Sequence, residues 1–378
     1  MIKGYYRIKP LKGISIDKAV ENVTTGMSIG TEQIAVHDSC EKWPSLRGKE
    51  PKKYLAEVSK LENDIFEICL DDSLIDWEYG PFTQLLSFFL GDTFGKAYDV
   101  QEIELIDLEL SEELFKHFPA CKYGVDGIHK LLGVGDRPLF SLLMKPNTGR
   151  PVEYYTDLAY QAALGGVDYI KEDELLFSPP GCKIIDRVKA IRESMERSAN
   201  TTGYKALHGI NITGSAANVL PMAKEVFNAG ASATMMTACY VGFDGVQSVT
   251  KNVDLPVHLH RAGHDVLVNG VKGLDLTVFT KLMKLSGADI IHVGCPEGNI
   301  HPPEKVKKNF EILQNWGNGN PLAVVSRCTS ESIERNCEFF GSDRLMFLFD
   351  KGIYGEGKDG DITKNSLAIR KKLESMPL

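Results

Sequence analysis

The chain has 378 residues, of which 43% are hydrophobic and 25% are charged, and its formal net charge is −8. This composition suits a globular protein with a large core, and the negative charge and absence of a basic run argue against a nucleic-acid partner. The first residues lack the apolar core of a signal peptide and no apolar run is long enough to span a membrane, so we expect a cytoplasmic protein with no membrane partner.

Residues 1–125 are predicted to form a small α+β domain. Amphipathic segments predict helices at residues 16–22 and 81–90, and short apolar runs predict strands at residues 5–8, 33–37, 55–63, 65–70 and 102–110. Strands and helices that do not alternate regularly are typical of this fold class. We place the domain boundary between residues 125 and 126.

Residues 126–378 contain a regular alternation of short apolar runs and helix-like amphipathic segments. Eight such units in about 250 residues predict a (β/α)8 TIM barrel, whose catalytic groups gather at the carboxyl ends of the strands. The predicted strands are residues 139–144, 167–170, 208–213, 232–237, 257–260, 289–293, 322–325 and 345–349.

Polar side chains lie at or just after the end of every predicted barrel strand. One such residue is ordinary in a loop, but a polar group at every strand end predicts a single shared active site. In chain order they are Lys145; Lys171, Asp173 and Glu174; Asn211 and Thr213; Thr237; His258, His260 and Arg261; His292; Ser326; and Asp350 with Lys351.

Residues 167–174 (VDYIKEDE) run from an apolar strand into a lysine and three carboxylates. Period-two alternation puts Lys171 and Asp173 on one side of the strand, and Glu174 follows at the mouth of the next loop. Carboxylate oxygens at this spacing suit a hard divalent cation such as Mg²⁺. Lys171 joins the ligands only if it is deprotonated or made anionic, for instance by addition of CO2 to its amine. The alternatives are a solvated strand end and a Lys171 ammonium paired with Asp173.

Several motifs, taken in order, resemble the large subunit of RuBisCO. The resemblance covers most of the chain and implies an amino-terminal α+β domain followed by a barrel. It also implies a homodimer in which the small domain of one subunit covers the barrel mouth of the other. The motifs are FPACKYGVDGIHKLLGV at residues 118–134, Lys145-Pro146, GGVDYIKEDE at 165–174, Asn211-Ile212-Thr213, and HLHRAGH at 258–264.

The resemblance implies roles for individual residues. Lys171 would be carbamylated by CO2 and would bind Mg²⁺ together with Asp173 and Glu174. Lys145 corresponds to a lysine that handles protons beside the substrate carbonyl. The positions that correspond to substrate contacts are His260, for hydroxyl groups, and Arg261 and His292, for phosphate.

Three departures separate the chain from the carboxylases of this family. The loop at residues 292–299 (HVGCPEGN) lacks the lysine that stabilises the added CO2, and Lys305 is too far along the chain to replace it. Asn147 stands where carboxylases have a lysine. Asp92 replaces an asparagine, which would change the charge near the metal. We therefore expect a RuBisCO-like protein that does not fix CO2, from a group whose characterised members enolise or isomerise phosphorylated keto sugars.

The turns after the last two predicted strands also depart from the family. Members bind phosphate there with glycine-rich turns, whereas this chain has Ser326-Arg327-Cys328-Thr329 and Phe349-Asp350-Lys351-Gly352. Asp350 would repel a phosphate dianion, while Arg327 and Lys351 would attract an anion. We therefore expect the substrate to carry a carboxylate, or one phosphate on the side of Arg261 and His292.

The leading hypothesis is a Mg²⁺-dependent enolase or isomerase that removes a proton next to the carbonyl of a sugar-derived, phosphorylated keto compound. Candidate bases are the carbamate on Lys171, Lys145, and Lys96 from the partner subunit, with His260 as a second proton shuttle. His258 either contacts substrate or packs inside the barrel. The alternatives are a decarboxylase or carbon–carbon lyase acting on a branched β-keto acid, and a non-catalytic metabolite-binding paralogue.

Overall fold

The computed structural model describes residues 1–30, 51–91, 94, 99–268, 270–298, 300–355 and 360–376. The predicted strand at 33–37 and the predicted site residues Asp92 and Lys96 lie outside these ranges. The chain forms two compact units, one of Met1–His117 with Gly263–Leu282 and another of Phe118–Ala262 with Met283–Leu378. The boundary at residues 125 and 126 stays a prediction. Within the described ranges, no helix has the length and apolarity needed to cross a membrane.

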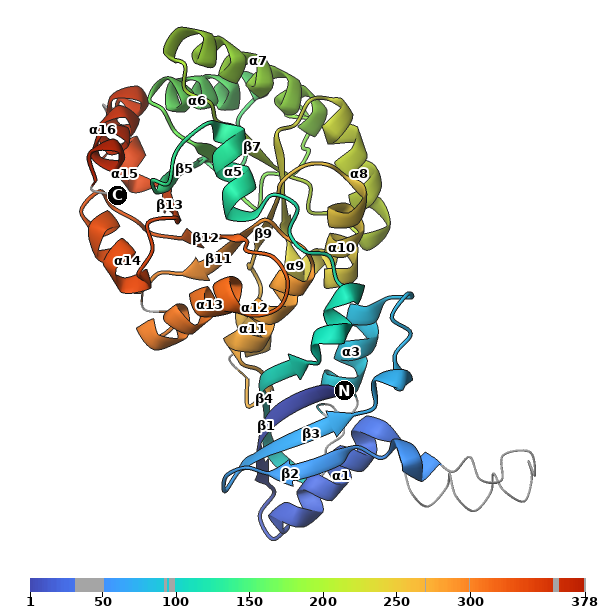
Figure 1. The fold of residues 1–378 in the computed structure, drawn as a ribbon. Coiled ribbons are helices and arrows are strands. Elements are labelled where there is room, and N and C mark those ends of the chain that lie inside the picture. The colour runs from blue at the N-terminus through green and yellow to red at the C-terminus, as the bar shows by residue number, and fades with distance from the viewer. Residues whose placement is uncertain are drawn as a thin grey trace. The chain divides into compact units, whose positions relative to one another are not determined.

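In its described part, the first unit is built on a five-stranded mixed sheet in the order β10-β4-β1-β3-β2 (Figure 1). β1 pairs antiparallel with β3 and β4, and alternate residues of β1, among them Ile2, Tyr6 and Ile8, are fully buried. The strands are β1 (Ile2–Pro10), β2 (Glu57–Lys60), β3 (Ile65–Leu70), β4 (Val100–Leu110) and β10 (Lys272–Leu274). The helices include α1 (Ile16–Ser28) and α3 (Pro81–Leu90), with 3-10 turns η2 (Pro51–Tyr54), η3 (Asp72–Leu74) and η4 (Glu112–His117).

In the first unit α1 runs six residues past its predicted end at residue 22, β1 extends beyond residues 5–8 at both ends, and two further elements differ from the predictions. The strand predicted at 55–63 is shorter, because β2 begins at Glu57 after the turn η2. β10 was not predicted, since three residues are too few to show a period-two pattern. It forms by parallel pairing with residues 103–105 of β4, an interaction between segments far apart in the chain.

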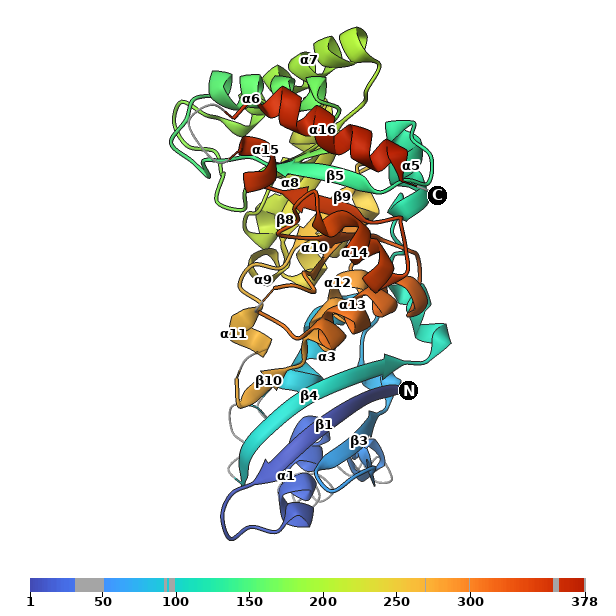
Figure 2. The ribbon, with the colours of Figure 1, turned by 90° about the vertical axis from the view of Figure 1, so that its left-hand side faces the viewer.

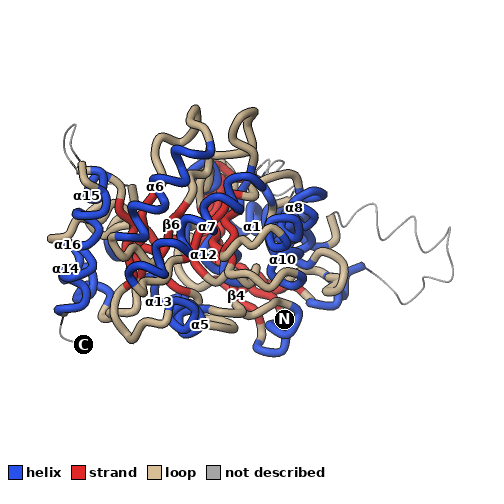
Figure 3. Tube along the Cα trace, turned by 90° about the horizontal axis from the view of Figure 1, so that it is seen from above, coloured by secondary structure: helices blue, strands red, loops and turns tan. Residues whose placement is uncertain are grey.

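The second unit contains a closed eight-stranded parallel barrel, which confirms the predicted fold class. The strand order is β11-β12-β13-β5-β6-β7-β8-β9, and the pairing of β11 with β9 closes the ring. Figure 3 shows the strands in red, with helices in blue on either side of them and in front of them. The barrel strands are β5 (Leu139–Leu143), β6 (Tyr169–Lys171), β7 (Leu207–Asn211), β8 (Ala233–Thr237), β9 (Val257–His260), β11 (Ile290–Gly294), β12 (Leu322–Val325) and β13 (Met346–Phe349).

Amphipathic helices follow the barrel strands. In α13, for example, Val306, Phe310 and Leu313 recur at helical spacing and are buried. Figure 2 shows α16 beside α6, although the two helices are far apart in the chain. The longer helices of the second unit are α6 (Val152–Leu164), α7 (Ile184–Thr202), α8 (Ala216–Asn228), α10 (Phe243–Asn252), α13 (Pro303–Asn315), α14 (Ser332–Phe340) and α16 (Ile362–Ser375), and the short ones are α9 (Ala238–Val241) and α15 (Lys351–Tyr354). Helix α11 (Asp265–Val268) and most of α12 (Leu276–Leu285) belong to the first unit.

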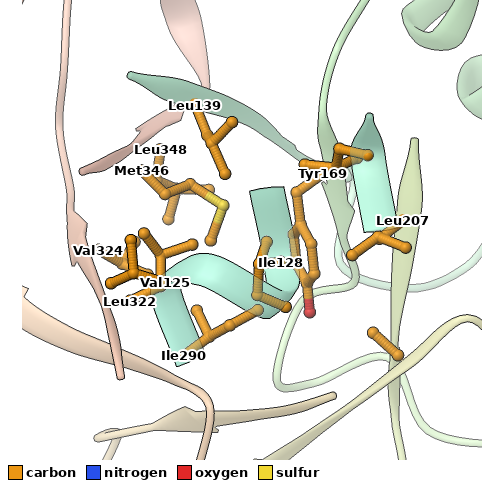
Figure 4. Packing of buried hydrophobic residues seen from close by; sticks show 12 residues of the cluster. Val125, Ile128, Leu139, Tyr169, Leu207, Ile290, Leu322, Val324, Met346 and Leu348 are labelled. Atoms are coloured by element: carbon orange, nitrogen blue, oxygen red, sulfur yellow. The ribbon is translucent and has the colours of Figure 1, made fainter. Parts of the chain in front are cut away.

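Helix α5 (Gly124–Leu132) closes the amino-terminal end of the barrel (Figure 4). Its residues Val125 and Ile128 pack in one apolar cluster with the first residues of several barrel strands. These strand residues are Leu139, Tyr169, Leu207, Ala233, Ile290, Leu322 and Met346. Because this apolar plug fills the amino-terminal end, polar groups are left to gather at the carboxyl ends of the strands.

Candidate active site

Lys171 is the last residue of β6 and is 1% exposed. Its ammonium donates to the backbone oxygen of Glu172 at 2.9 Å and lies 3.7 Å from Oε2 of Glu174. Burial lowers the pKa of Lys171, although the carboxylates of Glu174 and Asp173 oppose this effect. A lysine in these surroundings reaches its neutral, nucleophilic form at a lower pH than an exposed lysine does.

Asp173 and Lys145 form a second cation–anion pair beside Lys171. Lys145 follows β5, and its Nζ donates to Oδ2 of Asp173 at 2.6 Å and to Oδ1 of Asn147 at 2.6 Å. The other carboxylate oxygen of Asp173, Oδ1, accepts from the backbone N–H of Leu175 at 3.0 Å. The structure therefore brings together five of the residues that the sequence predicted for the site.

The charges of this group fit a divalent cation once Lys171 is carbamylated. In the structure the ammonium groups of Lys145 and Lys171 balance the carboxylates of Asp173 and Glu174. Addition of CO2 turns Lys171 from a cation into an anion and leaves two excess negative charges. Three anionic side chains with oxygen ligands then match the preference of Mg²⁺. Lys171, Asp173 and Glu174 are thus suited to hold the metal.

Glu172 directly follows β6 and forms a buried ion pair with Arg187 of α7. Its two oxygens accept from Nε and Nη2 of Arg187, both at 2.9 Å, and both side chains are fully buried. Oε2 also accepts from the backbone N–H of Asn211 at 3.0 Å, and Nε2 of His208 lies 3.3 Å from Oε1. Burial alone would raise the pKa of Glu172, but Arg187 and His208 hold it down to about 2. Glu172 therefore stays ionised and anchors the strand between Lys171 and Asp173.

Asn211, the last residue of β7, holds the loop that carries the two candidate ligands. Its side-chain Nδ2 donates to the backbone oxygens of Asp173 at 3.3 Å and Glu174 at 3.0 Å. A further contact at 3.3 Å reaches the backbone oxygen of Leu176. Asn211 is thus a positioning residue for the carboxylates.

We expect Asn211→Ala to weaken Mg²⁺ binding in bicarbonate by about 10- to 100-fold, because groups that orient metal ligands typically contribute this much to affinity. Titration calorimetry on both proteins measures the change. Asn228→Ala, at an exposed position on α8, is the matched control and should bind as the unaltered protein does. Equal affinity in Asn211→Ala would show that the loop holds its shape without this side chain.

Two tyrosines hold the backbone of Lys145. The hydroxyl of Tyr354 accepts from the Lys145 N–H at 2.7 Å and donates to the Leu143 oxygen at 3.0 Å, while the hydroxyl of Tyr154 donates to the Lys145 oxygen at 3.0 Å. Burial raises the pKa of Tyr354, so its hydroxyl keeps its proton. No sequence pattern points to these tyrosines, because the position of a tyrosine in a helix, here α6 for Tyr154 and α15 for Tyr354, does not reveal which backbone group its hydroxyl contacts.

Three histidine rings lie against one another at the ends of β9 and β11. The rings of His258 and His292 stack with centroids 4.9 Å apart, and His260 meets His292 edge-on at 4.9 Å. Burial lowers the pKa of both His258 and His292 well below the ordinary histidine value, so both are neutral. Nε2 of His260 lies 3.8 Å from Oε2 of Glu174, which joins His260 to the candidate metal ligands.

His258 and His292 differ in the hydroxyl group that their Nδ1 atoms contact. Nδ1 of His292 lies 3.1 Å from Oγ of Ser326, at the end of β12, which the sequence placed in the same site. Nδ1 of His258 lies 3.2 Å from the hydroxyl of Tyr169, a residue of the barrel plug. The contact with Tyr169 supports the alternative in which His258 packs inside the barrel.

The remaining predicted contacts lie farther along the rim. Arg261 is half-buried. A Cβ atom added to Gly294 would lie 3.4 Å from Nη2 of Arg261, so the arginine side chain passes close to the end of β11. Arg327 and Lys351 are exposed, and Arg327 has a φ of 57°. Asp350 caps α15, since its carboxylate accepts from the Lys351 N–H at 2.5 Å.

Comparisons with known proteins match most of the chain. The family model for the ribulose bisphosphate carboxylase large chain, catalytic domain, matches residues 124–316, and the model for its N-terminal domain matches residues 2–114. A ribulose bisphosphate carboxylase from Pyrococcus abyssi is 30% identical over 327 residues, covering 85% of this chain and 75% of the relative.

Two further similarities point to the same family. A 2,3-diketo-5-methylthiopentyl-1-phosphate enolase from Bacillus anthracis is 30% identical over 296 residues, covering 76% of this chain and 70% of the relative. The crystal structure of octameric ribulose-1,5-bisphosphate carboxylase/oxygenase with sulfate, from Pyrococcus horikoshii OT3, has a TM-score of 0.87 and 27% sequence identity. That similarity covers 99% of this chain and 87% of the other.

Proposed function

The chain belongs to the ribulose bisphosphate carboxylase large-chain family, and on this basis we propose that it enolises or isomerises a sugar-derived, phosphorylated keto compound in a Mg²⁺-dependent reaction that does not fix CO2. The similar proteins include both a carboxylase and an enolase. The choice between these activities therefore rests on the residues of this chain.

The observation that carries the proposal is a candidate metal site in a chain whose sequence after β11 lacks lysine. Lys145, Lys171, Asp173 and Glu174 lie together at the ends of β5 and β6. Residues 295–302, which follow β11, contain no lysine, and Lys305 lies in the first turn of α13. Abstraction of a proton needs a metal site and a base, whereas the resemblance assigns stabilisation of added CO2 to a lysine of that loop. The chain has the residues for the first task and lacks the lysine for the second.

The residues of the site divide the chemistry among them. A Mg²⁺ ion held by Lys171, Asp173 and Glu174 would stabilise negative charge that develops on the substrate carbonyl oxygen. The candidates for the base that accepts the proton next to the carbonyl are the carbamate on Lys171, Lys145 in its neutral form, whose Nζ contacts Asp173, and Lys96 of the partner subunit. His260 lies near Glu174 and is suited to move a second proton. We assign substrate-anion contacts to Arg261, His292 and Ser326, with Arg327 and Lys351 attracting anions at the rim.

Deuterium exchange tests the proposal. A panel of keto phosphates that includes 2,3-diketo-5-methylthiopentyl-1-phosphate is incubated in D2O with Mg²⁺ and bicarbonate, and NMR follows the carbon-bound protons. We expect exchange next to the carbonyl of at least one compound, and no incorporation of labelled CO2 into ribulose bisphosphate. Labelled CO2 in the product would contradict the proposal, as would a lack of exchange across the whole panel.

We expect Mg²⁺ binding at constant dissolved CO2 to strengthen as the pH rises from about 6 to about 9. The amine of Lys171 must lose its proton before it adds CO2, so protonation competes with carbamylation at low pH. Because burial lowers the pKa of Lys171, the rise should begin below the range of an ordinary lysine. Calorimetry at several pH values measures it. A Mg²⁺ affinity that does not change with pH in the presence of CO2 would indicate that Lys171 is not carbamylated.

We also propose a homodimer whose active site takes Lys96 and Asp92 from the partner subunit. The support is the family resemblance and the octameric assembly of one similar protein. Lys96→Ala and Lys171→Ala should each be inactive alone. Mixed under conditions of subunit exchange, they should recover about a quarter of the normal activity, since one site of each mixed dimer is intact. Subunit exchange without recovery would place Lys96 and Lys171 in the same subunit's site, and an active Lys96→Ala variant would show that Lys96 has no catalytic role.

A further inference from the structure

A cavity separate from the candidate active site lies in the second unit, between α7 and the amino-terminal ends of β7 and β8. Its volume is about 320 Å³. This equals the liquid volume of roughly ten water molecules and lies at the lower end of the range for small-molecule sites. Ala206 and Ser232 immediately precede β7 and β8 and line it. The candidate active site, in contrast, is built from the carboxyl ends of the strands.

One face of α7 supplies a wall that is apolar at Val188, Met195 and Ala199 and charged at Arg192 and Glu196. Val188, Arg192, Met195 and Ala199 line the cavity and recur at helical spacing, so they share that face. Leu131, from α5, faces the same cavity and is 39% exposed, a large fraction for a leucine. The lining would therefore favour a ligand with an apolar body.

Two cations lie at this cavity, Arg192 and Lys205. The side chain of Arg192 lies directly over Gly230, because an ideal Cβ there would be 2.8 Å from its Cδ and 3.0 Å from its Nη1. Gly230 also has a φ of +93°, which other residues rarely adopt, so glycine is required both by the backbone and by the position of Arg192.

Glu196 also lines the cavity, but its weak pairing with Arg192 leaves the cations available to an anion. The carboxylate of Glu196 lies 3.8 Å from Nε of Arg192, beyond hydrogen-bond distance, and both side chains are largely exposed, so this pair is weak. His208 lines the inner wall and is 3% exposed, with its Nε2 turned toward Glu172. A bound carboxylate would thus lie near two cations, and it would compete only with the weakly paired Glu196 for Arg192.

We propose that this cavity binds a small amphipathic carboxylate of about ten non-hydrogen atoms. Its head contacts the guanidinium of Arg192 and the ammonium of Lys205, and its apolar body lies against Leu131, Met195 and Ala199. Charge-assisted hydrogen bonds hold the head, and burial of the hydrocarbon supplies the rest of the affinity. The site does not depend on the metal chemistry proposed above.

Calorimetry with octanoate, below its micelle-forming concentration, tests the proposal on the full chain. We expect one saturable site per chain and at least about tenfold weaker binding by Arg192→Gln, which loses a charged hydrogen-bond donor. Ala199→Phe should abolish binding, because the larger side chain fills the cavity. Arg197→Gln is the matched control on α7. Its guanidinium lies over the ring of Tyr160, 4.7 Å from the centroid, so this variant should bind octanoate normally.

The uncharged analogue 1-octanol separates the contribution of the carboxylate to the binding affinity from that of the hydrocarbon part of the ligand. We expect it to bind at least about tenfold more weakly than octanoate. Thermal unfolding confirms that each variant is folded. The proposal is overturned if the unaltered protein shows no saturable binding, if folded Ala199→Phe binds as well as the unaltered protein, or if octanol binds as tightly as octanoate. Because the test measures binding and not turnover, failure of the proposed enolase activity leaves it unaffected.

Discussion

Lys171→Ala is expected to abolish the bicarbonate-dependent part of Mg²⁺ binding and to reduce substrate deuterium exchange by at least about 10³-fold. The variant removes the buried lysine of the candidate metal site. Addition of CO2 to its amine forms a carbamate, whose oxygen can bind the metal. Calorimetry with and without bicarbonate reports on the metal site. NMR in D2O reports on the chemistry. The two losses should occur together, because both depend on one anionic group.

Lys189→Ala is the matched control, since Lys189 is an exposed lysine on α7. It should retain bicarbonate-dependent binding and exchange. Bicarbonate-enhanced Mg²⁺ binding that persists in Lys171→Ala would move the carbamate elsewhere and contradict the assignment. Loss of exchange with unchanged metal binding would instead make Lys171 a catalytic group that does not hold the metal.

Arg187→Met is expected to lower the free energy of unfolding by about 3–5 kcal/mol, because it leaves the buried carboxylate of Glu172 without its cation. The pair is fully buried on both sides, and Glu172 also anchors the backbone of Asn211. Urea unfolding at neutral pH measures the loss. Since Glu172 lies between Lys171 and Asp173, Mg²⁺ binding should weaken as well.

Two further variants separate this buried pair from ordinary surface charge. Arg192→Met removes an exposed pair with Glu196 on the same helix and should cost less than about 1 kcal/mol. The double variant Glu172→Gln with Arg187→Met should be more stable than Arg187→Met alone, because it removes the unpaired charge. An Arg187→Met loss no larger than that of Arg192→Met would show that Glu172 finds another partner or becomes protonated.

The pH dependence of the Glu172 contribution follows from its folded-state pKa of about 2, below the ordinary value of 4.5. A carboxyl group whose pKa is lower in the folded than in the unfolded state stabilises the folded state at pH values above its unfolded-state pKa. This stabilisation is lost as the pH falls to the folded-state pKa. In the unaltered protein the loss should therefore occur between about pH 4.5 and about pH 2.

The barrel followed from the sequence because its signal is local. Each of its strands is a short apolar run, as expected for parallel strands covered on both faces, and an amphipathic segment follows each run. β10 was missed because its stability comes from an edge of β4 that is more than 160 residues earlier in the chain, as its pairing of Lys272 with Ile103 shows. Short segments that depend on such pairing leave no periodic signal of their own.

Within the candidate site, local spacing again separates what was predicted from what was not. Lys171, Asp173 and Glu174 are adjacent in the chain, so strand alternation alone predicts that they end near one another. Their grouping with Lys145 could be expected only from the rule that parallel strand ends meet, and the 2.6 Å contact between Lys145 and Asp173 agrees with that rule.

The sequence by itself determined the fold class, the family and the residues that carry the proposed chemistry, because apolar periodicity and adjacent motifs are encoded locally. Only the tertiary structure decided how those residues are held. Arg187 balances Glu172 across 15 residues, Tyr354 holds Lys145 across 209, and Gly230, in the turn after α8, makes room for Arg192 of α7. The contacts of Arg187 and Tyr354 arise because burial of a charge or a polar backbone group is costly without a partner, and the fold determines which partner lies nearby.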